Sequence, residues 1–314
     1  MDLFDVLMKR RSVRSFEDRP IPETLVDELL EVANNAPSGG NIQPLSIIVV
    51  EDPDDRARLA DLVGGQPWVR NAPLSLIFCL DFHRVKRWAS MFDVEFLGER
   101  CLGSFLIAYA DVMCAAQSVV VLAESRGLGS VYVGTIQSSM GQAREYFGIP
   151  DRVLPIMVLS LGFPRSVPST IPKLQTDVIA HRGRYRVPDD DEIRDAFESK
   201  YGSIDDDIDE YLKRAYIEVI EADRHLGGKA AGGSASDGSA SVGGDKSYDA
   251  AGWKDRAKRR MKSLGIKSNA EFLFKLRYPQ RVMVGMTADR AAALRAAGFD
   301  FPGVMSEPVS PGAP

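Results

Sequence analysis

The most informative part of the chain opens with Arg10-Arg11-Ser12-Val13-Arg14-Ser15-Phe16 and closes with Ala36-Pro37-Ser38-Gly39-Gly40-Asn41-Ile42-Gln43-Pro44. The first segment concentrates three guanidinium groups and a hydroxyl, which suit the oxygens of a phosphate. The second is a turn of small and amide side chains, where the backbone can approach a planar ligand and Asn41 can both donate and accept. One predicted helix separates the two segments, so the fold could bring both to one pocket.

Each segment alone has a plainer interpretation. Basic residues at the end of a first helix are favoured by the helix dipole and often face water. A turn such as residues 36–44 also forms routinely between a helix and a strand at the surface. The occurrence of both in this order favours a shared site for a ligand with a phosphate and a flat ring.

The pattern along the chain predicts an α+β fold with long helices and few strands. A helix begins after Pro22 and stops near Asn34-Asn35, and a second, longer helix covers residues 104–126 with Gly127 just beyond its end. Short apolar runs rich in β-branched residues predict strands. These runs are residues 46–50, 74–80, 131–134 and 154–161.

Composition narrows the class of protein. The chain has 314 residues and a net charge of −5, which argues against nucleic-acid binding. No secretory signal is recognisable at the N-terminus, and the apolar stretch 102–123, interrupted by Asp111 and Gln117, is interpreted as a buried helix and not as a membrane span. The three cysteines are expected to be buried free thiols, as in a cytoplasmic protein.

The organisation predicted from composition has four parts. Residues 1–225 form the main domain, and 226–250 form a flexible loop dominated by Gly and Ser. Residues 251–281 form a basic helical extension of the same domain, and 282–314 form a C-terminal tail with one short helix. The basic residues 254–262 are interpreted either as one solvated helix face or, through Arg256, Arg259 or Arg260, as a site for the 2′-phosphate of NADPH.

The two opening segments resemble the signature of the FMN-dependent nitroreductase family. Further segments, including Gly64–Val69, Ala123–Gly134 and Val153–Pro164, resemble its larger, NADPH-preferring subgroup of nitroreductases and flavin reductases. The resemblance covers residues 4–225 and, more faintly, 253–281. It implies a mixed sheet surrounded by helices and an intertwined homodimer with two FMN sites, each built from both subunits.

The resemblance also implies which residues bind the cofactor. Around the FMN phosphate, ribityl chain and pyrimidine edge it places Arg10, Arg11, Ser12 and Arg14, with Lys173 near the phosphate. From the neighbouring turn it adds Pro37, Ser38, Gly39 and Asn41, and it brings Gln66 to the ring. The main chain of Val133, Gly134 and Thr135 would face the isoalloxazine near N5. Gln66 has the alternative of a solvated loop amide.

The implied reaction is a hydride transfer from NADPH or NADH to FMN N5, then two-electron reduction of a nitroaromatic, quinone or flavin with ping-pong kinetics. Arg14 is the candidate for stabilising the negative charge of the reduced flavin. Ile171 stands where the subgroup often has a basic residue, and the Asn41 turn is closer to the smaller subgroup, so the preference between NADPH and NADH stays open.

Other chemistries find less support in the sequence. His83, His181 and His225 have no metal-ligand spacing, and Ser12 lacks the partners of a hydrolytic triad. Gly127-Leu128-Gly129 follows a helix and lacks the third glycine of a dinucleotide fingerprint. Three alternatives stay open: a related flavoenzyme with dehalogenase or flavin-fragmenting chemistry, a non-catalytic flavin-binding protein, and a polyanion-binding surface, which the acidic charge disfavours.

Overall fold

The structure is a computed structural model, and it describes residues 2–168, 170–202, 259, 261–266, 271, 273 and 280–302. The predicted parts 226–250 and 203–225, together with Arg256 and Arg260, lie outside the described residues. The chain divides into two compact units, residues 1–170 with 286–314 and residues 171–285. The last strand of the described sheet ends at Gly162, and the main domain 1–225 suggested by composition stays a prediction.

The described residues of the first unit form one antiparallel sheet with the strand order β1-β2-β4-β3. The strands are β1 (Leu45–Val50), β2 (Leu74–Asp81), β3 (Gly129–Val133) and β4 (Val153–Gly162). Strands β2 and β4 at the centre pair from Leu74↔Leu161 to Asp81↔Val153, with a bulge at Phe78/Cys79. Every residue of β2 is buried, in agreement with a sequence that is apolar apart from Ser75 and Asp81.

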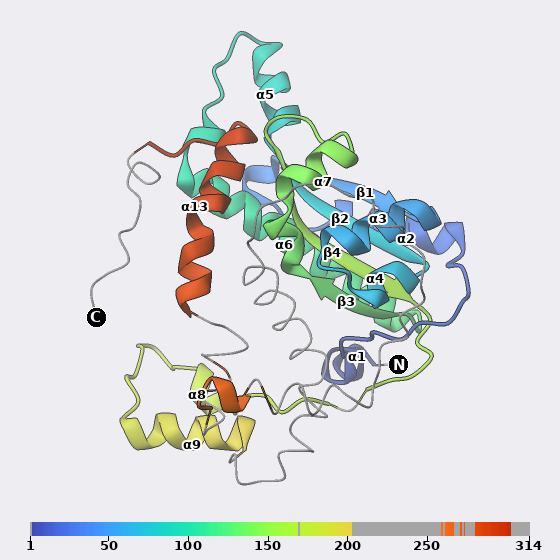
Figure 1. The fold of residues 1–314 in the computed structure, drawn as a ribbon. Helices are drawn as coiled ribbons and strands as arrows, with labels where there is room; N and C mark the ends of the chain where they lie inside the picture. The colour runs from blue at the N-terminus through green and yellow to red at the C-terminus, as the bar shows by residue number, and fades with distance from the viewer. Residues whose placement is uncertain are drawn as a thin grey trace. The chain divides into compact units, whose positions relative to one another are not determined.

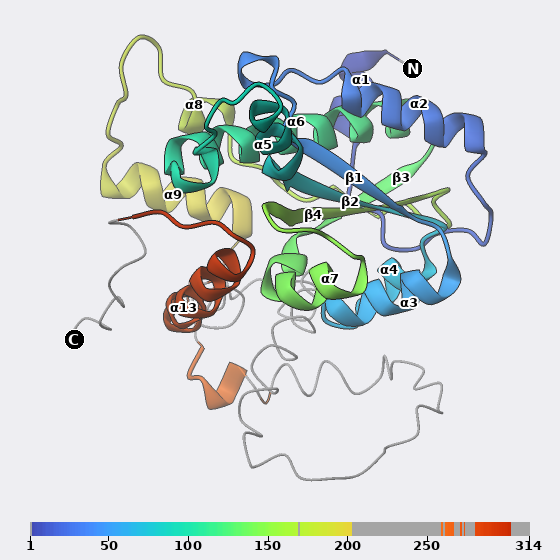
Figure 2. The ribbon, with the colours of Figure 1, turned by 90° about the horizontal axis from the view of Figure 1, so that it is seen from above.

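Helices cover both faces of this sheet (Figures 1 and 2). Figure 2 shows α2 and α6 on one face and α3, α4 and α7 on the other. The helices of this unit are α1 (Leu3–Lys9), α2 (Glu23–Asn34), α3 (Pro53–Leu62), α4 (Pro67–Asn71), α5 (Phe82–Ser90), α6 (Leu102–Ser125) and α7 (Met140–Tyr146). The α+β prediction is confirmed, as are the predicted strands to within two residues at each end. The four strands pair antiparallel, and an isolated parallel bridge joins Ser12 to β3.

Helix α6 is the longest helix of the described chain, and only one side of it is buried. Its buried side consists of small and β-branched residues such as Ala108, Val112 and Val119, which belong to the core beneath the sheet. Leu106 and Ile107 are 59% and 57% exposed on the other side. By length and composition alone α6 could cross a membrane, but here it packs along the sheet and α2. The prediction that residues 102–123 form a buried helix therefore holds for only one side of α6 within a single chain.

The C-terminal segment contributes to the core, in contrast to the tail expected from residue 282 onward. Helix α13 (Gln280–Ala296) spans the boundary between the two units, and the chain that follows it is packed in the first unit. Phe299 is fully buried, with its ring 5.9 Å from that of Phe82 and 5.7 Å from that of Phe105. Burial of an aromatic ring of this size stabilises the packing of the segment after α13 against the core.

The cysteines also differ in part from the expectation. Cys79 is buried in β2, and burial raises the pKa of its thiol to about 12. Cys101 caps the N-terminus of α6 and Cys114 lies on the outer side of the same helix, so both thiols are exposed. Apolar residues next to a cysteine in the sequence did not predict its burial, because α6 has apolar residues on its exposed side as well.

The second unit contributes α8 (Thr176–Ile179) and α9 (Asp190–Tyr201). Helix α9 begins with a capping box in which Asp189 accepts from the Glu192 amide and Glu192 accepts from the Asp189 amide. Arg186 adds a two-point ion pair to Glu192 at 2.7 Å. This local network explains why the charged sequence after residue 189 is helical.

Candidate functional site

The segment that follows α1 lies along the edge strand β3. The Val13 amide donates to the Ser130 carbonyl at 2.9 Å, and Ser12 forms an isolated parallel bridge with Ser130. Val13 is buried against Gly129, where an added Cβ would lie 2.6 Å from Val13 Cγ2. A glycine at position 129 thus lets the segment approach the strand closely, and this contact fixes residues 10–14 on β3.

Three arginines of this segment, Arg10, Arg11 and Arg14, together with Ser12, are called the arginine cluster below. All four residues are half-buried. The guanidinium of Arg14 lies 5.5 Å from the ring centre of Trp68 at the start of α4. The Arg11 Nη1 group donates to the Lys9 carbonyl at 2.7 Å. The cluster therefore combines concentrated positive charge with partial removal from water, which strengthens its attraction for an anion.

Two buried N–H donors in this region have no hydrogen-bond partner among the described residues, Arg11 Nε and Trp68 Nε1. Buried donors are nearly always paired in folded proteins, so an unpaired one calls for an explanation. A bound anion with several acceptor oxygens would provide one.

A carboxylate also belongs to the surroundings of the cluster. Glu124, in the last turn of α6, is within electrostatic reach of Arg10 and Arg11 and hydrogen bonds with Ser130. Burial raises the pKa of Glu124 to about 7, although the two arginines and Ser130 act in the opposite direction. Tyr132 of β3 also interacts with Arg10, and burial raises the pKa of its phenol to about 12.

The predicted ring contacts lie together at the end of β3. Gln66 is buried, and its amide nitrogen donates to the Val63 carbonyl and to Thr135 Oγ1, each at 3.0 Å. The Thr135 hydroxyl donates to the same Val63 carbonyl at 3.0 Å. Gly134 is exposed at the start of a short 3₁₀ helix, Gly134–Ser138, where the first main-chain N–H groups lack helical acceptors. Gln66 is thus held by the fold, and the alternative of a solvated loop amide is excluded.

The turn of residues 37–41 lies at a different place within the chain. Its Gly39 amide donates to both carboxylate oxygens of Asp111 in α6, at 3.1 and 3.0 Å. Gly40 and Asn41 both have positive φ, 59° and 54°, a conformation that glycine adopts freely and asparagine tolerates. Asn41 is exposed. The turn is therefore a rigid loop that presents its outer side to solvent.

The two predicted segments therefore do not meet within one chain. The turn is attached to α6 at Asp111, and the arginine cluster faces Glu124 near the end of the same helix. At 1.5 Å per residue these two positions are about 20 Å apart along the helix axis. A single pocket for both, as expected from the sequence, would need a second chain.

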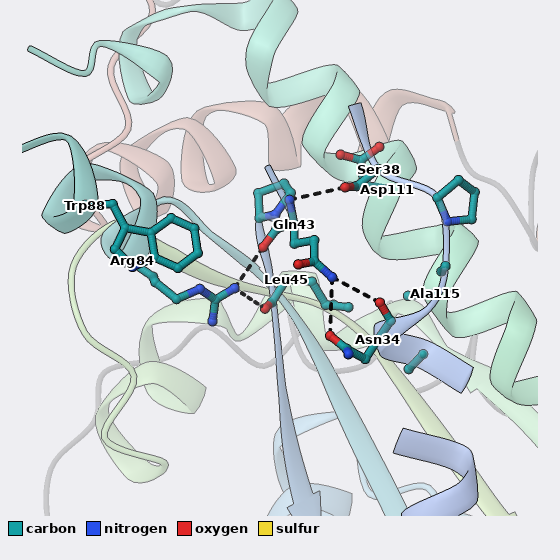
Figure 3. Close-up of a pocket in the computed structure, with 12 residues that line it drawn as sticks. Asn34, Ser38, Gln43, Leu45, Arg84, Trp88, Asp111 and Ala115 are labelled. Atoms are coloured by element: carbon teal, nitrogen blue, oxygen red, sulfur yellow. Dashed lines mark hydrogen bonds between the residues drawn. The ribbon is translucent and has the colours of Figure 1, made fainter. Parts of the chain in front are cut away.

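A cavity of about 280 Å³ lies behind the turn (Figure 3). Its polar side chains bond to one another and to main-chain carbonyls. Arg84 donates to the carbonyls of Gln43 and Leu45 at 2.8 and 2.7 Å, and the Gln43 side chain donates to the Asn34 carbonyl at 3.0 Å. The residues that line this cavity stabilise the turn through these hydrogen bonds. Their polar side chains are therefore already paired within the protein.

Lys173 is exposed in the second unit, between β4 and α8, and its predicted contact with a phosphate stays a prediction. Arg259 is exposed and helical, whereas Arg256 and Arg260 lie outside the described residues. Sequence reasoning missed Trp68, Glu124 and Asp111. Trp68 and Glu124 both stand within segments quoted for the family resemblance, and Asp111 is one of the polar interruptions of the apolar α6, so each had a detectable signal.

The fold and the arginine cluster define the class of protein. The sequence model of the nitroreductase family matches residues 7–163, and this chain belongs to that family. It is 30% identical to the FMN reductase [NAD(P)H] of Bacillus subtilis over 209 residues, which are 66% of this chain and 82% of the relative. It is also 30% identical to the oxygen-insensitive NADPH nitroreductase of Salmonella typhimurium, over 59% of this chain and 75% of that protein.

Solved structures agree with this assignment. The NfrA1 nitroreductase from B. subtilis is 29% identical, with a TM-score of 0.62 over 68% of this chain and 86% of that structure. The NADPH:FMN oxidoreductase from Vibrio harveyi, solved in complex with NAD+, is 27% identical, with a TM-score of 0.57 over 74% and 92% of the two chains.

Proposed function

We propose that this protein is an FMN-dependent NAD(P)H oxidoreductase that reduces nitroaromatic, quinone or flavin acceptors. The observation that carries the proposal is the arginine cluster, half-buried on β3, with two buried donors, Arg11 Nε and Trp68 Nε1, that have no partner among the described residues. A phosphomonoester offers the acceptor oxygens that such donors lack. The names of the relatives, FMN reductases and an NADPH nitroreductase among them, point to the same cofactor and donor.

Each residue group has a distinct role in this proposal. The arginine cluster binds the phosphate and, through Arg14, the polar edge of the flavin ring. The Gln66–Thr135 pair, fixed by Val63, orients the ring, and the exposed main chain at Gly134 lies against it. FMN, when bound, supplies the hydride and electron chemistry, and these residues bind, orient and set the local electric field.

We propose further that the active form is a homodimer in which the second chain completes each site. The exposed stripe of α6, with Leu106, Ile107, Ala110 and Cys114 at helical spacing, is apolar and continuous. Contiguous exposed apolar surface of this kind is typical of a protein interface. The stripe lies on the helix that connects the turn with the arginine cluster, so pairing of two such helices would bring the turn of one chain to the cluster of the other.

The visible spectrum of the purified protein tests the proposed function. We expect yellow flavin absorbance that bleaches when NADPH is added without oxygen and returns when a nitrofuran or a quinone is added. Steady-state rates at several acceptor concentrations should give parallel double-reciprocal lines. A colourless protein that also fails to bind added FMN would overturn the proposal. Bound FMN that neither NADPH nor NADH reduces would indicate a non-catalytic flavoprotein. Convergent double-reciprocal lines would contradict the ping-pong mechanism. A cytoplasmic location remains a prediction from the sequence.

A further inference from the structure

A half-buried carboxyl group lies near the positive charges assigned to the phosphate. Glu124 reaches the arginine cluster from the last turn of α6, and its Oε1 is buried with no hydrogen-bond partner among the described residues. Its charged neighbours are Arg10 and Arg11, from the segment after α1, and Ser130 of β3 hydrogen bonds with it. An ionised carboxylate there would attract the same two guanidinium groups that the phosphate needs.

We propose that Glu124 is a proton-linked positioning residue for the FMN phosphate, because its carboxyl group competes for Arg10 and Arg11 when ionised and releases them when protonated. The inference rests on the proposed function, since it assigns the arginine cluster to that phosphate. Glu124 itself would not touch the reacting atoms of the flavin. It would act through the charges of the two arginines, which its ionised form partly neutralises.

Two further titratable groups, Tyr132 and Arg126, are neighbours of Arg10 and, in the sequence, of Glu124, respectively. Tyr132, which shares Arg10, has its pKa raised to about 12 and stays neutral in the range considered. Arg126, two positions beyond Glu124, is paired with Glu28 of α2 at 2.8 Å, so its charge is largely balanced. Glu124 is therefore the group of this region that changes charge near neutral pH.

The sign of the linkage follows from the charges. Burial raises the pKa of Glu124 to about 7 in the free protein, and an added phosphate dianion would raise it further. The bound state then holds more protons than the free state above pH 7, so FMN affinity should fall as the pH rises. Because one coupled proton changes affinity at most tenfold per pH unit, we expect roughly a tenfold loss between pH 7 and 8.5.

The test compares FMN dissociation constants of the native apoprotein, Glu124→Gln and Glu28→Gln between pH 6.5 and 8.5, measured by quenching of flavin fluorescence. We expect Glu124→Gln to bind FMN with an affinity that stays level above pH 7. Glu28→Gln is the matched control, because Glu28 is a carboxylate on the neighbouring helix that pairs with Arg126 instead of the cluster. It should keep the native pH dependence.

A second measurement does not depend on the folding of a variant. Calorimetry of FMN binding to the native apoprotein at pH 7.5, in buffers of different ionisation enthalpy, should report net proton uptake of a fraction of one proton. Equal pH dependence in native protein and Glu124→Gln, or no proton uptake by the native protein, would overturn the role of Glu124 and leave FMN binding intact. Failure of the native apoprotein to bind FMN would overturn both the role and the proposed function.

Discussion

At the scale of single residues, the arginine cluster depends on guanidinium geometry as well as on charge. Arg11 uses one Nη to hold the Lys9 carbonyl, while its buried Nε has no partner among the described residues. A lysine at this position would keep the charge but lose the fork of donors that can serve both acceptors. The identity of the cation should therefore matter to binding more than its charge.

Arg11→Lys tests this requirement through FMN affinity. We expect the dissociation constant to rise about 10- to 100-fold, since a hydrogen bond to a charged group contributes about 1.5–3 kcal/mol. Arg126→Lys is the matched control, because Arg126 makes an exposed ion pair with Glu28 away from the cluster. Equal affinity of Arg11→Lys and the native protein would show that the phosphate is held elsewhere.

A second residue-scale prediction concerns Glu99, a buried carboxylate between Lys86 and Arg152. Burial acts to raise the pKa of Glu99, but the hydrogen bond and charge of Lys86, helped by Arg152, hold it below the ordinary value. A carboxylate with a depressed folded pKa adds stability above its unfolded pKa of about 4.3, and this stability is lost as the pH falls through the folded value. The ion pair should thus stabilise the fold at neutral and higher pH and lose this contribution in acid.

We expect Glu99→Gln to lower the free energy of unfolding by about 1–2 kcal/mol at pH 7, less than for a fully buried pair because both cations reach water. The difference from the native protein should shrink as the pH is lowered from 5 to 3. Urea unfolding at each pH gives the comparison, with Glu145→Gln, at an exposed position of α7, as control for the loss of one carboxylate. A difference that grows on acidification would contradict the assignment.

At the scale of elements, the turn of residues 37–41 is held to α6 by a single carboxylate. Both oxygens of Asp111 accept from the Gly39 amide, and an added Cβ on Gly39 would lie 2.6 Å from Ile107 Cγ2. The close approach favours glycine, and Asp111, one of the few polar residues of a largely apolar helix, accepts the Gly39 amide. Removing Asp111 should leave that amide unpaired and free the turn to move.

Asp111→Ala is therefore expected to cost about 1–3 kcal/mol of stability, the usual penalty for a part-buried donor left without its acceptor. It should also weaken FMN binding, because the turn would no longer be fixed. Asp61→Ala, which removes an exposed ion pair with Arg70, is the control and should change stability by less than about 1 kcal/mol. Unchanged FMN affinity in Asp111→Ala would remove the turn from the proposed site.

Elements with strong local patterns could be predicted from the sequence, whereas contacts between distant elements could not. The strands could be predicted because short apolar runs such as residues 74–80 carry their own signal, and Gly127 marks the end of α6. The hydrogen bond between Val13 and Ser130, which positions the arginine cluster, joins two segments that are far apart in the sequence. The burial of Phe299 likewise depends on rings from Phe82 and Phe105 that are remote in sequence.

At the scale of the whole molecule, the separation of the turn from the arginine cluster makes the oligomer testable without a structure of it. If each site takes its cluster from one chain and its turn from the other, a defect in the cluster and a defect in the turn can be placed on different chains. Arg11→Ala disables the cluster of its own chain, and Asp111→Ala loosens the turn of its own chain. Each homodimer of either variant then has two damaged sites.

A heterodimer of one Arg11→Ala chain and one Asp111→Ala chain has a different distribution of damage. One of its sites combines both defects, while the other combines the intact cluster of one chain with the intact turn of the other. We expect the heterodimer, purified through two different affinity tags, to bind one FMN per dimer with native affinity and to show about half the native activity at saturating cofactor. Sites built within single chains would instead leave both sites damaged, and the heterodimer would behave as the average of its two parents.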